Sequence, residues 1–472
     1  MFEQSFIPSA IGSSQADRSL AKSARGRQTQ LGHPAANLFC RDMLGRGGAT
    51  PLAEVFQVLS GMLAEHPGLA TEEVTAGEAL DRLGTAPITA PEDLPAHPRS
   101  VMDGYAVRAA DTFGASASLP AYLTISGEVK MGEMPLHGPA PTECYRIATG
   151  GLLPPGTDAV VMLEHTVTAD DNVLEVLKPV APGGNIIARG DDVRTGEVLL
   201  PAGHRFRPCD LGLLAGLGIQ KLQVFRQPRV GIISTGDEIV PPEQNPPPGK
   251  IRDMNMAGLT AMVYQQGAIP LNYGIVGDNE QAFVAQLEKA LAECDLILFS
   301  GGSSVGVGDL GERVLSRLTD PGILVHGVAI KPGKPVIIAA HGHKPVFGLP
   351  GHPVSAAAAF ALLVRPVLAR LAGLHSGQAK DGEGFPIDLP RPLGSAILQR
   401  NLNSAAGRTD LVPVRLETQA DGTLGAIPVL GKSSALSTLV RSQGWIIIAA
   451  HLQGLSAGSE VAVYNFEGLN CP

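Results

Sequence analysis

Apolar residues recur at helical spacing near the start of the chain and in shorter runs farther along. The helical set consists of Leu52, Val55, Phe56, Leu59 and Met62. This spacing of three to four residues predicts an amphipathic helix over 51–65 whose apolar face packs into a core. Short apolar runs separated by Gly- and Pro-rich turns occupy 71–226, and they predict strands.

The pattern changes at about residue 228, where runs of Val, Ile and Leu begin to alternate with amphipathic stretches. The predicted strands are 230–234, 271–276, 296–300, 323–330, 336–340 and 345–349, and the predicted helices are 255–266, 280–293, 309–318 and 353–372. Nearly continuous apolar strands are typical of a parallel sheet that is covered on both faces. Short strands return after the last helix, at 411–416, 426–430, 444–449 and 460–464.

These patterns predict a multidomain α/β plus β fold. Its centre is a doubly wound, mostly parallel α/β domain, accompanied by an inserted β-rich domain, a small linking domain and a C-terminal β domain. The predicted segments are a disordered extension (1–45), an N-terminal helix with the first part of the linking domain (46–98), the inserted domain (99–190), the second part of the linking domain (191–227), the α/β domain (228–374) and the C-terminal domain (375–472).

Composition and charge narrow the possible partners. The 36 Lys and Arg residues against 45 Asp and Glu residues give a formal net charge of −9, which supplies no overall attraction for nucleic acid. The five cysteines lie far apart without a CxxC pair, so neither a disulfide framework nor a zinc cluster is indicated. The most apolar stretches, 356–364 and 445–450, are shorter than the roughly 20 residues of a membrane span. We therefore expect a cytoplasmic protein with neither a nucleic-acid nor a membrane partner.

Acids, glycines and lysines follow the predicted strands of the α/β domain. The segments are TGDE (235–238), GDN (277–279), GGSSVGVGD (301–309), KPGKP (331–335) and GLPGHPVS (348–355). We expect them to share one rim, because each follows a strand of a mostly parallel sheet. Ligands bind at this carboxyl edge of an open parallel sheet. Loop amides and lysines suit a phosphorylated anion, and carboxylates suit a hard cation such as Mg²⁺. Asp237, Asp278 and Asp309 are equally suited to cap helices, but three acids with two lysines favour the anion site.

Other site patterns are weaker. The GxGxxG match at 306–311 lies in the third βα unit, and Lys331 stands where a ribose-binding acid is expected about 20 residues on. A Walker A sequence and a GxSxG elbow are both missing from the chain, which disfavours a general ATPase or esterase. His341 and His343 flank one residue in a Gly-rich turn, and no HExxH motif supports a transition-metal site.

Together, the rim motifs resemble those of the molybdopterin molybdenumtransferase family, which includes the E domain of gephyrin. Residues 98–108 resemble the family's MDGYA motif, and 146–151 and 155–161 resemble its next block. The segments 407–410 and 433–436 resemble parts of its last domain. The resemblance extends from about residue 50 to the end of the chain.

This resemblance implies a transferase that inserts molybdate into adenylylated molybdopterin with Mg²⁺-dependent release of AMP. It further implies a homodimer whose active site lies between subunits, and it allows contacts with proteins of molybdoenzyme maturation. The residues carried over by position are Asp278, Asp309, Asp103, Thr149 and Glu238 for catalysis; Ser300, Gly301, Gly302, Ser304, Lys331, Lys334, Pro335, Arg408 and Ser433 for substrate binding; and Asp278, Asp309, Asp237 and Glu238 for Mg²⁺.

Three residues depart from the family's usual motifs. Ser303 replaces an apolar residue, Asn279 replaces a second Asp, and His352 replaces the Asn of GLPGNPVS. His352 either adds a titratable group or, as we favour, substitutes for an amide hydrogen bond. These departures keep open an alternative, a catalytically reduced molybdopterin-binding or scaffolding protein. A third hypothesis, a nicotinamide-dependent dehydrogenase, predicts that the protein binds NAD. The choice between molybdate and tungstate is open at this stage.

Overall fold

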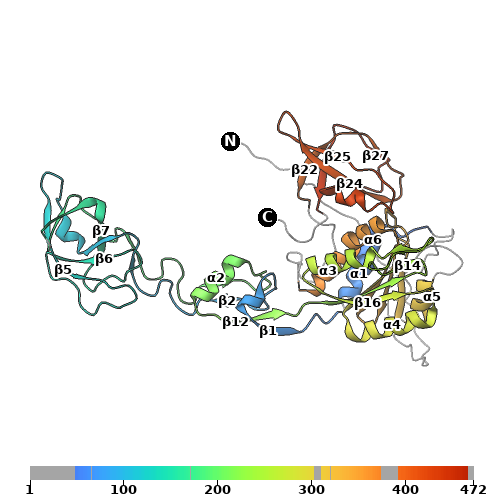
Figure 1. Cartoon of the computed structure of the whole chain (residues 1–472), viewed down its shortest axis with the longest axis horizontal. Helices are drawn as coiled ribbons and strands as arrows, with labels where there is room; N and C mark the ends of the chain where they lie inside the picture. The colour runs from blue at the N-terminus through green and yellow to red at the C-terminus, as the bar shows by residue number, and fades with distance from the viewer. Residues whose placement is uncertain are drawn as a thin grey trace, which may run out of the picture. The chain divides into compact units, whose positions relative to one another are not determined.

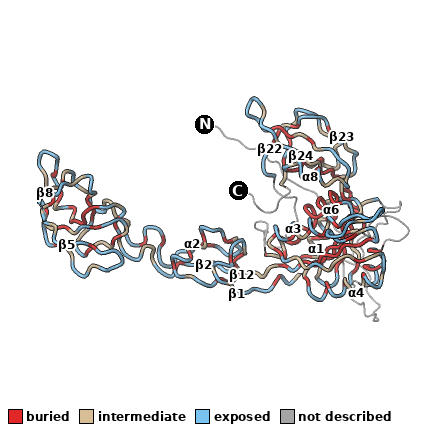
Figure 2. The backbone as a smooth tube through the Cα atoms, in the orientation of Figure 1, coloured by how far each residue is buried: buried red, intermediate tan, exposed pale blue. Residues whose placement is uncertain are grey.

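The structure is a computed structural model that describes residues 48–64, 66–170, 172–301, 310–318, 320–373 and 392–465. The predicted extension, 1–45, lies outside these residues. Figure 1 shows several groups of helices and strands along the chain, and Figure 2 shows that buried residues lie inside these groups.

The α/β domain contains a six-stranded sheet in the order β16-β13-β17-β21-β20-β18. Its strands are β13 (Arg229–Thr235), β16 (Ile269–Val276), β17 (Leu296–Ser300), β18 (Pro321–His326), β20 (Ile337–His341) and β21 (Lys344–Leu349). β16, β13, β17 and β21 run parallel, whereas β20 is antiparallel to both of its neighbours. The mostly parallel sheet is confirmed, and the carboxyl ends of its four parallel strands share one edge.

Helices cover both faces of this sheet, as Figure 1 shows. They are α1 (Leu52–Ala64), α3 (Asn255–Gln265), α4 (Glu280–Glu293), α5 (Leu310–Leu318), α6 (Pro353–Ala359) and α7 (Arg365–Leu371), with a π-helical turn, η5 (Phe360–Val364), between the last two. Alternate residues of one strand enter different cores. Ile232 packs with α1, α3 and α6, whereas Ile233 packs with α4 and α5. The doubly wound arrangement follows from this alternation.

One predicted strand is wrong. The apolar run 323–330 is not a single strand, because the chain turns at Gly327, which has a φ of +87°. β18 ends at His326, and the next strand, β19 (Ile330–Lys331), pairs with a strand of the C-terminal domain. A positive φ is unfavourable for residues with a side chain, so the glycine permits the change of direction.

The helical segment from Pro353 to Leu371 is interrupted where Pro366 follows Arg365. Proline lacks the N–H group that would bond the preceding turn, which explains the π-helical turn over Phe360–Val364. Among the described residues, this segment is the one helix whose length and apolar character match a membrane span. The fold buries 78% of an apolar 18-residue stretch of it, and Figure 2 shows the region around α6 as buried. It therefore forms part of the core of the α/β domain.

The inserted domain contains a six-stranded sheet in the order β7-β4-β6-β5-β9-β8. The elements are β4 (Gly104–Val107), β5 (Ala121–Glu128), β6 (Glu143–Ile147), β7 (Ala159–Met162), β8 (Thr166–Asp170) and β9 (Val173–Val176), with the short helices η3 (Ala109–Thr112) and η4 (Leu163–His165) and the strand pair β3 (Arg99–Ser100) and β10 (Ile186–Ile187). Gly104 belongs to the MDGYA segment, and a Cβ there would lie 1.9 Å from the carbonyl oxygen of Val161. Only glycine therefore allows β4 and β7 to approach this closely.

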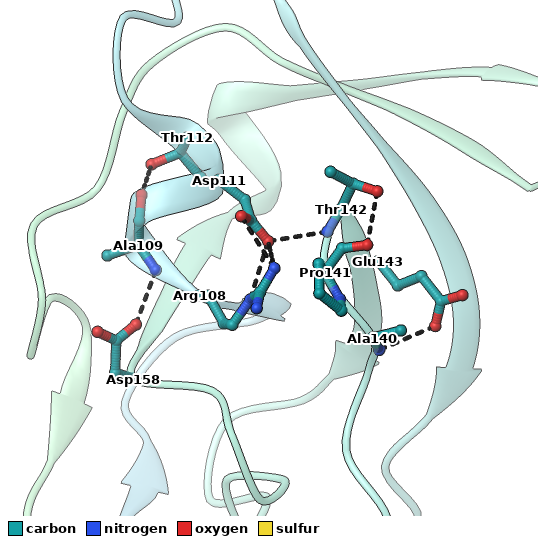
Figure 3. A network of polar contacts seen from close by, with 9 residues as sticks. All are labelled: Arg108, Ala109, Asp111, Thr112, Ala140, Pro141, Thr142, Glu143 and Asp158. Carbon is teal, nitrogen blue, oxygen red and sulfur yellow. Dashed lines mark hydrogen bonds and ion pairs between the residues drawn. The ribbon is translucent and has the colours of Figure 1, made fainter.

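Polar contacts hold η3 against two loops of the inserted domain (Figure 3). Arg108 pairs with Asp111 at 2.9 Å, and Asp111 also accepts the Thr142 N–H at 3.0 Å. Asp158 accepts the Ala109 N–H at 2.7 Å, which satisfies a donor at the start of the turn. These side chains support the fold of the domain and take no part in the site described below.

Two segments of the chain, one before and one after the inserted domain in sequence, form the linking region. It contains β1 (Thr71–Thr75), η2 (Ala76–Ala79), β2 (Ile88–Thr89), β11 (Val198–Leu200), α2 (Pro208–Gly216) and β12 (Lys221–Phe225). β1 pairs with β12, and β2 pairs with β11, both antiparallel. These pairings join segments that lie far apart in sequence, and they enclose a small core around Phe206 and Leu214.

The C-terminal domain is a small closed barrel. β24 pairs with both β25 and β26, and the order β24-β25-β22-β28-β26 returns to β24. The strands are β22 (Gly394–Leu398), β24 (Thr409–Thr418), β25 (Leu424–Pro428), β26 (Gly444–Ile448) and β28 (Glu460–Tyr464), with the pair β23 (Leu402–Asn403) and β27 (Gly454–Leu455) and the helix α8 (Ser437–Val440). β19 of the preceding domain pairs in parallel with Thr409 and Asp410, the first two residues of β24.

Candidate functional site

A cavity of about 990 Å³ lies where the rim of the α/β sheet meets the C-terminal barrel. The predicted site residues that line it are Glu238, Ser300, Gly301, Lys331, Lys334, Pro335, Arg408 and Ser433, and His352 lines it as well. The strand pair β14 (Ile239–Val240) and β15 (Ile251–Arg252) adds to the same wall. The topology thus brings together loops that follow different strands, as an open α/β sheet does at its carboxyl edge.

One buried carboxylate holds two cationic side chains in this cavity. Arg408 Nε lies 2.8 Å from Asp410 Oδ1, and Lys331 Nζ lies 3.9 Å from Asp410 Oδ2. The Asp410 side chain is 5% exposed, whereas Lys331 and Arg408 are 59% and 36% exposed. The β19–β24 pairing places Lys331 directly opposite Asp410. Two cations share one anion, and the exposed Lys334 adds a further positive charge, so this part of the cavity suits an anion.

His352 joins the rim to the C-terminal barrel. Its Nδ1 lies 2.9 Å from Ser433 Oγ, and the Val354 N–H donates to the Ser433 carbonyl at 3.1 Å. An imidazole nitrogen can accept from a hydroxyl or donate to it, as an amide can. His352 therefore makes the kind of contact that the usual Asn of this motif is able to make.

The turn after β17 approaches the backbone of β13 very closely. The Thr235 hydroxyl donates to the Ser300 carbonyl at 3.3 Å. Gly301 has a φ of +95°, and a Cβ at this position would lie 2.2 Å from the Thr235 carbonyl oxygen. Glycine is required here on both counts. It brings main-chain atoms of the rim to the cavity without an intervening side chain.

Three of the four predicted metal ligands lie in the loops after β13 and β16. The Asp278 N–H donates to Asp237 Oδ1 at 2.9 Å, so these two loops touch. Glu238 lines the cavity, whereas Asp237 and Asp278 do not. Asn279 caps α4 by accepting the Ala282 N–H at 2.9 Å. Within the described ranges, no three His, Cys, Asp or Glu side chains gather as a complete metal site.

Asp103 and Thr149 lie in the inserted domain and bond to each other. Asp103 Oδ1 accepts the Thr149 N–H at 2.7 Å and the Thr149 hydroxyl at 2.9 Å. These hydrogen bonds, the backbone one first, lower the pKa of Asp103. The carboxylate is therefore ionised at neutral pH and cannot act as a general acid there. Neither residue lines the cavity.

Four residues from the sequence predictions, Gly302, Ser303, Ser304 and Asp309, lie outside the described residues. Conversely, sequence reasoning missed Asp253, Asn255 and Asp410 in the cavity wall. Asp410 stands in the segment 407–410, but its link to Lys331 depends on a strand pairing between residues far apart in the chain. Asn255 donates to the Gly351 carbonyl at 2.8 Å, and this contact also joins distant segments.

Family models match three successive parts of the chain. They are described as MoeA N-terminal region (domain I and II) over residues 50–218, probable molybdopterin binding domain over 231–370, and MoeA C-terminal region (domain IV) over 395–466. The molybdopterin molybdenumtransferase of Haemophilus influenzae is 33% identical over 88% of this chain and 98% of its own length. The chain belongs to the molybdopterin molybdenumtransferase family.

Further members of this family agree in sequence and in fold. The molybdopterin molybdenumtransferase of Bacillus subtilis is 32% identical over 83% of this chain and 89% of its own length. A solved structure of a molybdopterin biosynthesis MoeA protein from Pyrococcus horikosii has a TM-score of 0.73 and 34% identity, over 89% of this chain and 100% of that one. The resemblance inferred from the motifs and the multidomain fold are confirmed, and the Haemophilus influenzae and Bacillus subtilis relatives are transferases by name.

Proposed function

We propose that this protein inserts molybdate into adenylylated molybdopterin and releases AMP in a Mg²⁺-dependent step. The observation that carries this proposal is the cavity between the α/β rim and the barrel, in a chain of this family. It combines close main-chain approach at Gly301 with the cations Lys331, Lys334 and Arg408. A tetrahedral dianion and a pyrophosphate link both require such complementary charge.

The cationic group and Ser433 would bind molybdate, and the turn at Ser300 and Gly301 would hold phosphate or pterin atoms. Phosphoryl-type cleavage depends mainly on positioning and electrostatics, so the chain does not need a covalent nucleophile for it. Cations that are already held in place by Asp410 would meet the incoming anion without reorganisation.

The acidic loops fit Mg²⁺ by the chemistry of their donors. Asp237, Glu238 and Asp278 supply carboxylate oxygens from two touching loops. Mg²⁺ is usually held by one or two carboxylates together with substrate phosphates, so a complete protein cage is not needed. When bound there, the ion would offset the charge of the pyrophosphate.

We also propose that the active protein is a homodimer in the cytoplasm. Asp103 and Thr149 do not line the cavity of their own chain. A role for them in the reaction is consistent with an inserted domain that reaches the cavity of a second copy. Contacts with proteins of molybdoenzyme maturation remain an expectation from the family.

The first test is AMP release from adenylylated molybdopterin, measured with and without molybdate in the presence of Mg²⁺. The wild type should release AMP in a molybdate-dependent way, and Asp278→Asn should slow the release by about 100-fold or more, because a carboxylate that would hold Mg²⁺ near the reacting phosphate is lost. Asp421→Asn is a matched control, since Asp421 only caps a turn of the barrel next to Thr423. Tight binding by the wild type without release would instead favour the binding or scaffolding protein.

A second prediction concerns His352. His352→Asn should keep AMP release and the KM for molybdate within about threefold of the wild type, because the amide can restore the hydrogen bond to Ser433. His352→Ala should raise that KM by about tenfold, since Ser433 loses its side-chain partner. Steady-state kinetics on both variants checks this. A raised KM in His352→Asn as well would show that the imidazole has a role of its own.

A further inference from the structure

The wall of the cavity holds two further polar side chains that the proposed reaction leaves unexplained. Asp253 and Ser234 both line the cavity and are 6% and 2% exposed. Asp253 Oδ2 and Ser234 Oγ have no hydrogen-bond partner among the residues that the structure describes. Buried polar atoms nearly always have partners in native proteins, so two such atoms in one cavity wall require an explanation.

The fold explains why one oxygen of Asp253 is left over. Asp253 Oδ1 accepts the Met256 N–H at 3.0 Å and so caps the start of α3, while Oδ2 makes no such contact. The neighbouring Arg252 does not neutralise this oxygen, because its guanidinium donates to the Pro242 carbonyl and to Asn245 Oδ1. An uncompensated carboxylate at a buried position costs free energy of folding.

Ser234 lies on the same side of the sheet as Asp253. Side chains alternate along a strand, so Ser234 shares the face of Ile232, and that face packs against Leu259 of α3. The end of β13 and the start of α3 therefore present a carboxylate oxygen and a hydroxyl to one part of the cavity. A carboxylate accepts hydrogen bonds only, and a hydroxyl accepts or donates, so this part of the cavity suits a ligand with N–H donors.

We infer that Asp253 and Ser234 form the subsite for the pterin ring of the substrate, with Asp253 Oδ2 accepting from its amino-pyrimidinone edge. This inference rests on the proposed function. The edge carries an amino group next to a ring N–H, so it presents adjacent donors to an acceptor. The amino group of adenine also donates, but its neighbouring ring nitrogens are acceptors, which a carboxylate repels. The cations Lys331, Lys334 and Arg408 remain available for the phosphate and molybdate charges.

Asp253→Asn tests the subsite with little change to the fold. Asn caps a helix as well as Asp does, so its oxygen can keep the Met256 contact and place the amide NH₂ where Oδ2 stood. An acceptor thus becomes a donor. The dissociation constants of adenylylated molybdopterin and of AMP are measured at equilibrium, without molybdate or Mg²⁺. We expect adenylylated molybdopterin to bind about tenfold or more weakly and AMP to bind as it does to the wild type.

A thermal melt on the same samples separates a ligand site from a structural one. Because Asp253→Asn removes an uncompensated buried charge, its melting temperature should equal or exceed that of the wild type. Asp421→Asn, which alters a capping carboxylate of the barrel, should change neither binding constant. If Asp253→Asn does not fold, Ser234→Ala removes only the unpaired hydroxyl, and adenylylated molybdopterin should still bind a few-fold more weakly.

Two other outcomes overturn the inference. If Asp253→Asn bound AMP and adenylylated molybdopterin more weakly by the same factor, the subsite would belong to adenine. Unchanged affinity for both in a folded Asp253→Asn protein would mean that these atoms face only water. A wild type that binds adenylylated molybdopterin but releases no AMP would refute the proposed reaction and leave this binding test intact.

Discussion

Gly301→Ala is expected to destabilise the α/β domain by about 3 kcal/mol and to reduce AMP release by about 100-fold. The added Cβ would lie 2.2 Å from the Thr235 carbonyl oxygen, which is a main-chain atom of a central strand and cannot rotate away. The φ of +95° adds strain for any residue with a Cβ. Relief of the clash must move the turn away from β13, and shifts of about 1 Å at a reacting centre are costly.

Calorimetric melting measures the loss of stability, and the AMP assay measures the loss of activity. Gly258→Ala is the matched control, because Gly258 lies inside α3 and a Cβ there meets no atom within 4 Å. Alanine at that position should stabilise the helix by about 0.5–1 kcal/mol. A Gly301→Ala protein with the melting temperature and activity of the wild type would show that the turn does not depend on this close approach.

Asp410→Asn is expected to lower the free energy of unfolding of the barrel by about 2 kcal/mol and to weaken molybdate binding by at least about tenfold. The substitution removes the buried charge between Lys331 and Arg408, and the two cations then repel each other. We take a value below that of a fully buried pair because both cations are partly exposed to water.

Urea unfolding followed by tryptophan fluorescence measures this loss, because Trp445 is the sole tryptophan of the chain and lies opposite Pro413 of β24. Glu417→Gln is the control within the same strand, since Glu417 pairs with Arg415 at the surface and such pairs contribute about 0–1 kcal/mol. If Asp410→Asn unfolded like Glu417→Gln and bound molybdate normally, the shared carboxylate would not position the two cations.

Local patterns predicted much of the fold. The alternation of apolar strands with amphipathic helices is a property of neighbouring residues, and it located the parallel sheet and the helices on both of its faces. The predicted strand 323–330 was wrong because a local pattern does not contain pairings between distant segments. The residues around Gly327 are apolar enough for one strand, and the break depends on a pairing with β24 about 80 residues later in the chain.

The candidate site shows the same division between local and distant information. Motifs predicted that Gly301, Lys331 and Arg408 serve one site, and the structure places all three around one cavity, although their roles remain predictions. The polar partners were not predictable. Asp410 holds Lys331 across a strand pair, and the unpaired oxygen of Asp253 becomes evident only when the surrounding atoms are placed.

The short strand β19 makes the segment 331–335 common to two domains. Lys331 is hydrogen-bonded into the sheet of the barrel, whereas Ile337, six residues later, belongs to the sheet of the α/β domain. Any rotation of the barrel must therefore displace Lys331 relative to the α/β rim. The segment 331–335 connects the two domains directly. The spacing of the positive charges around a bound anion and the orientation of the barrel therefore change together.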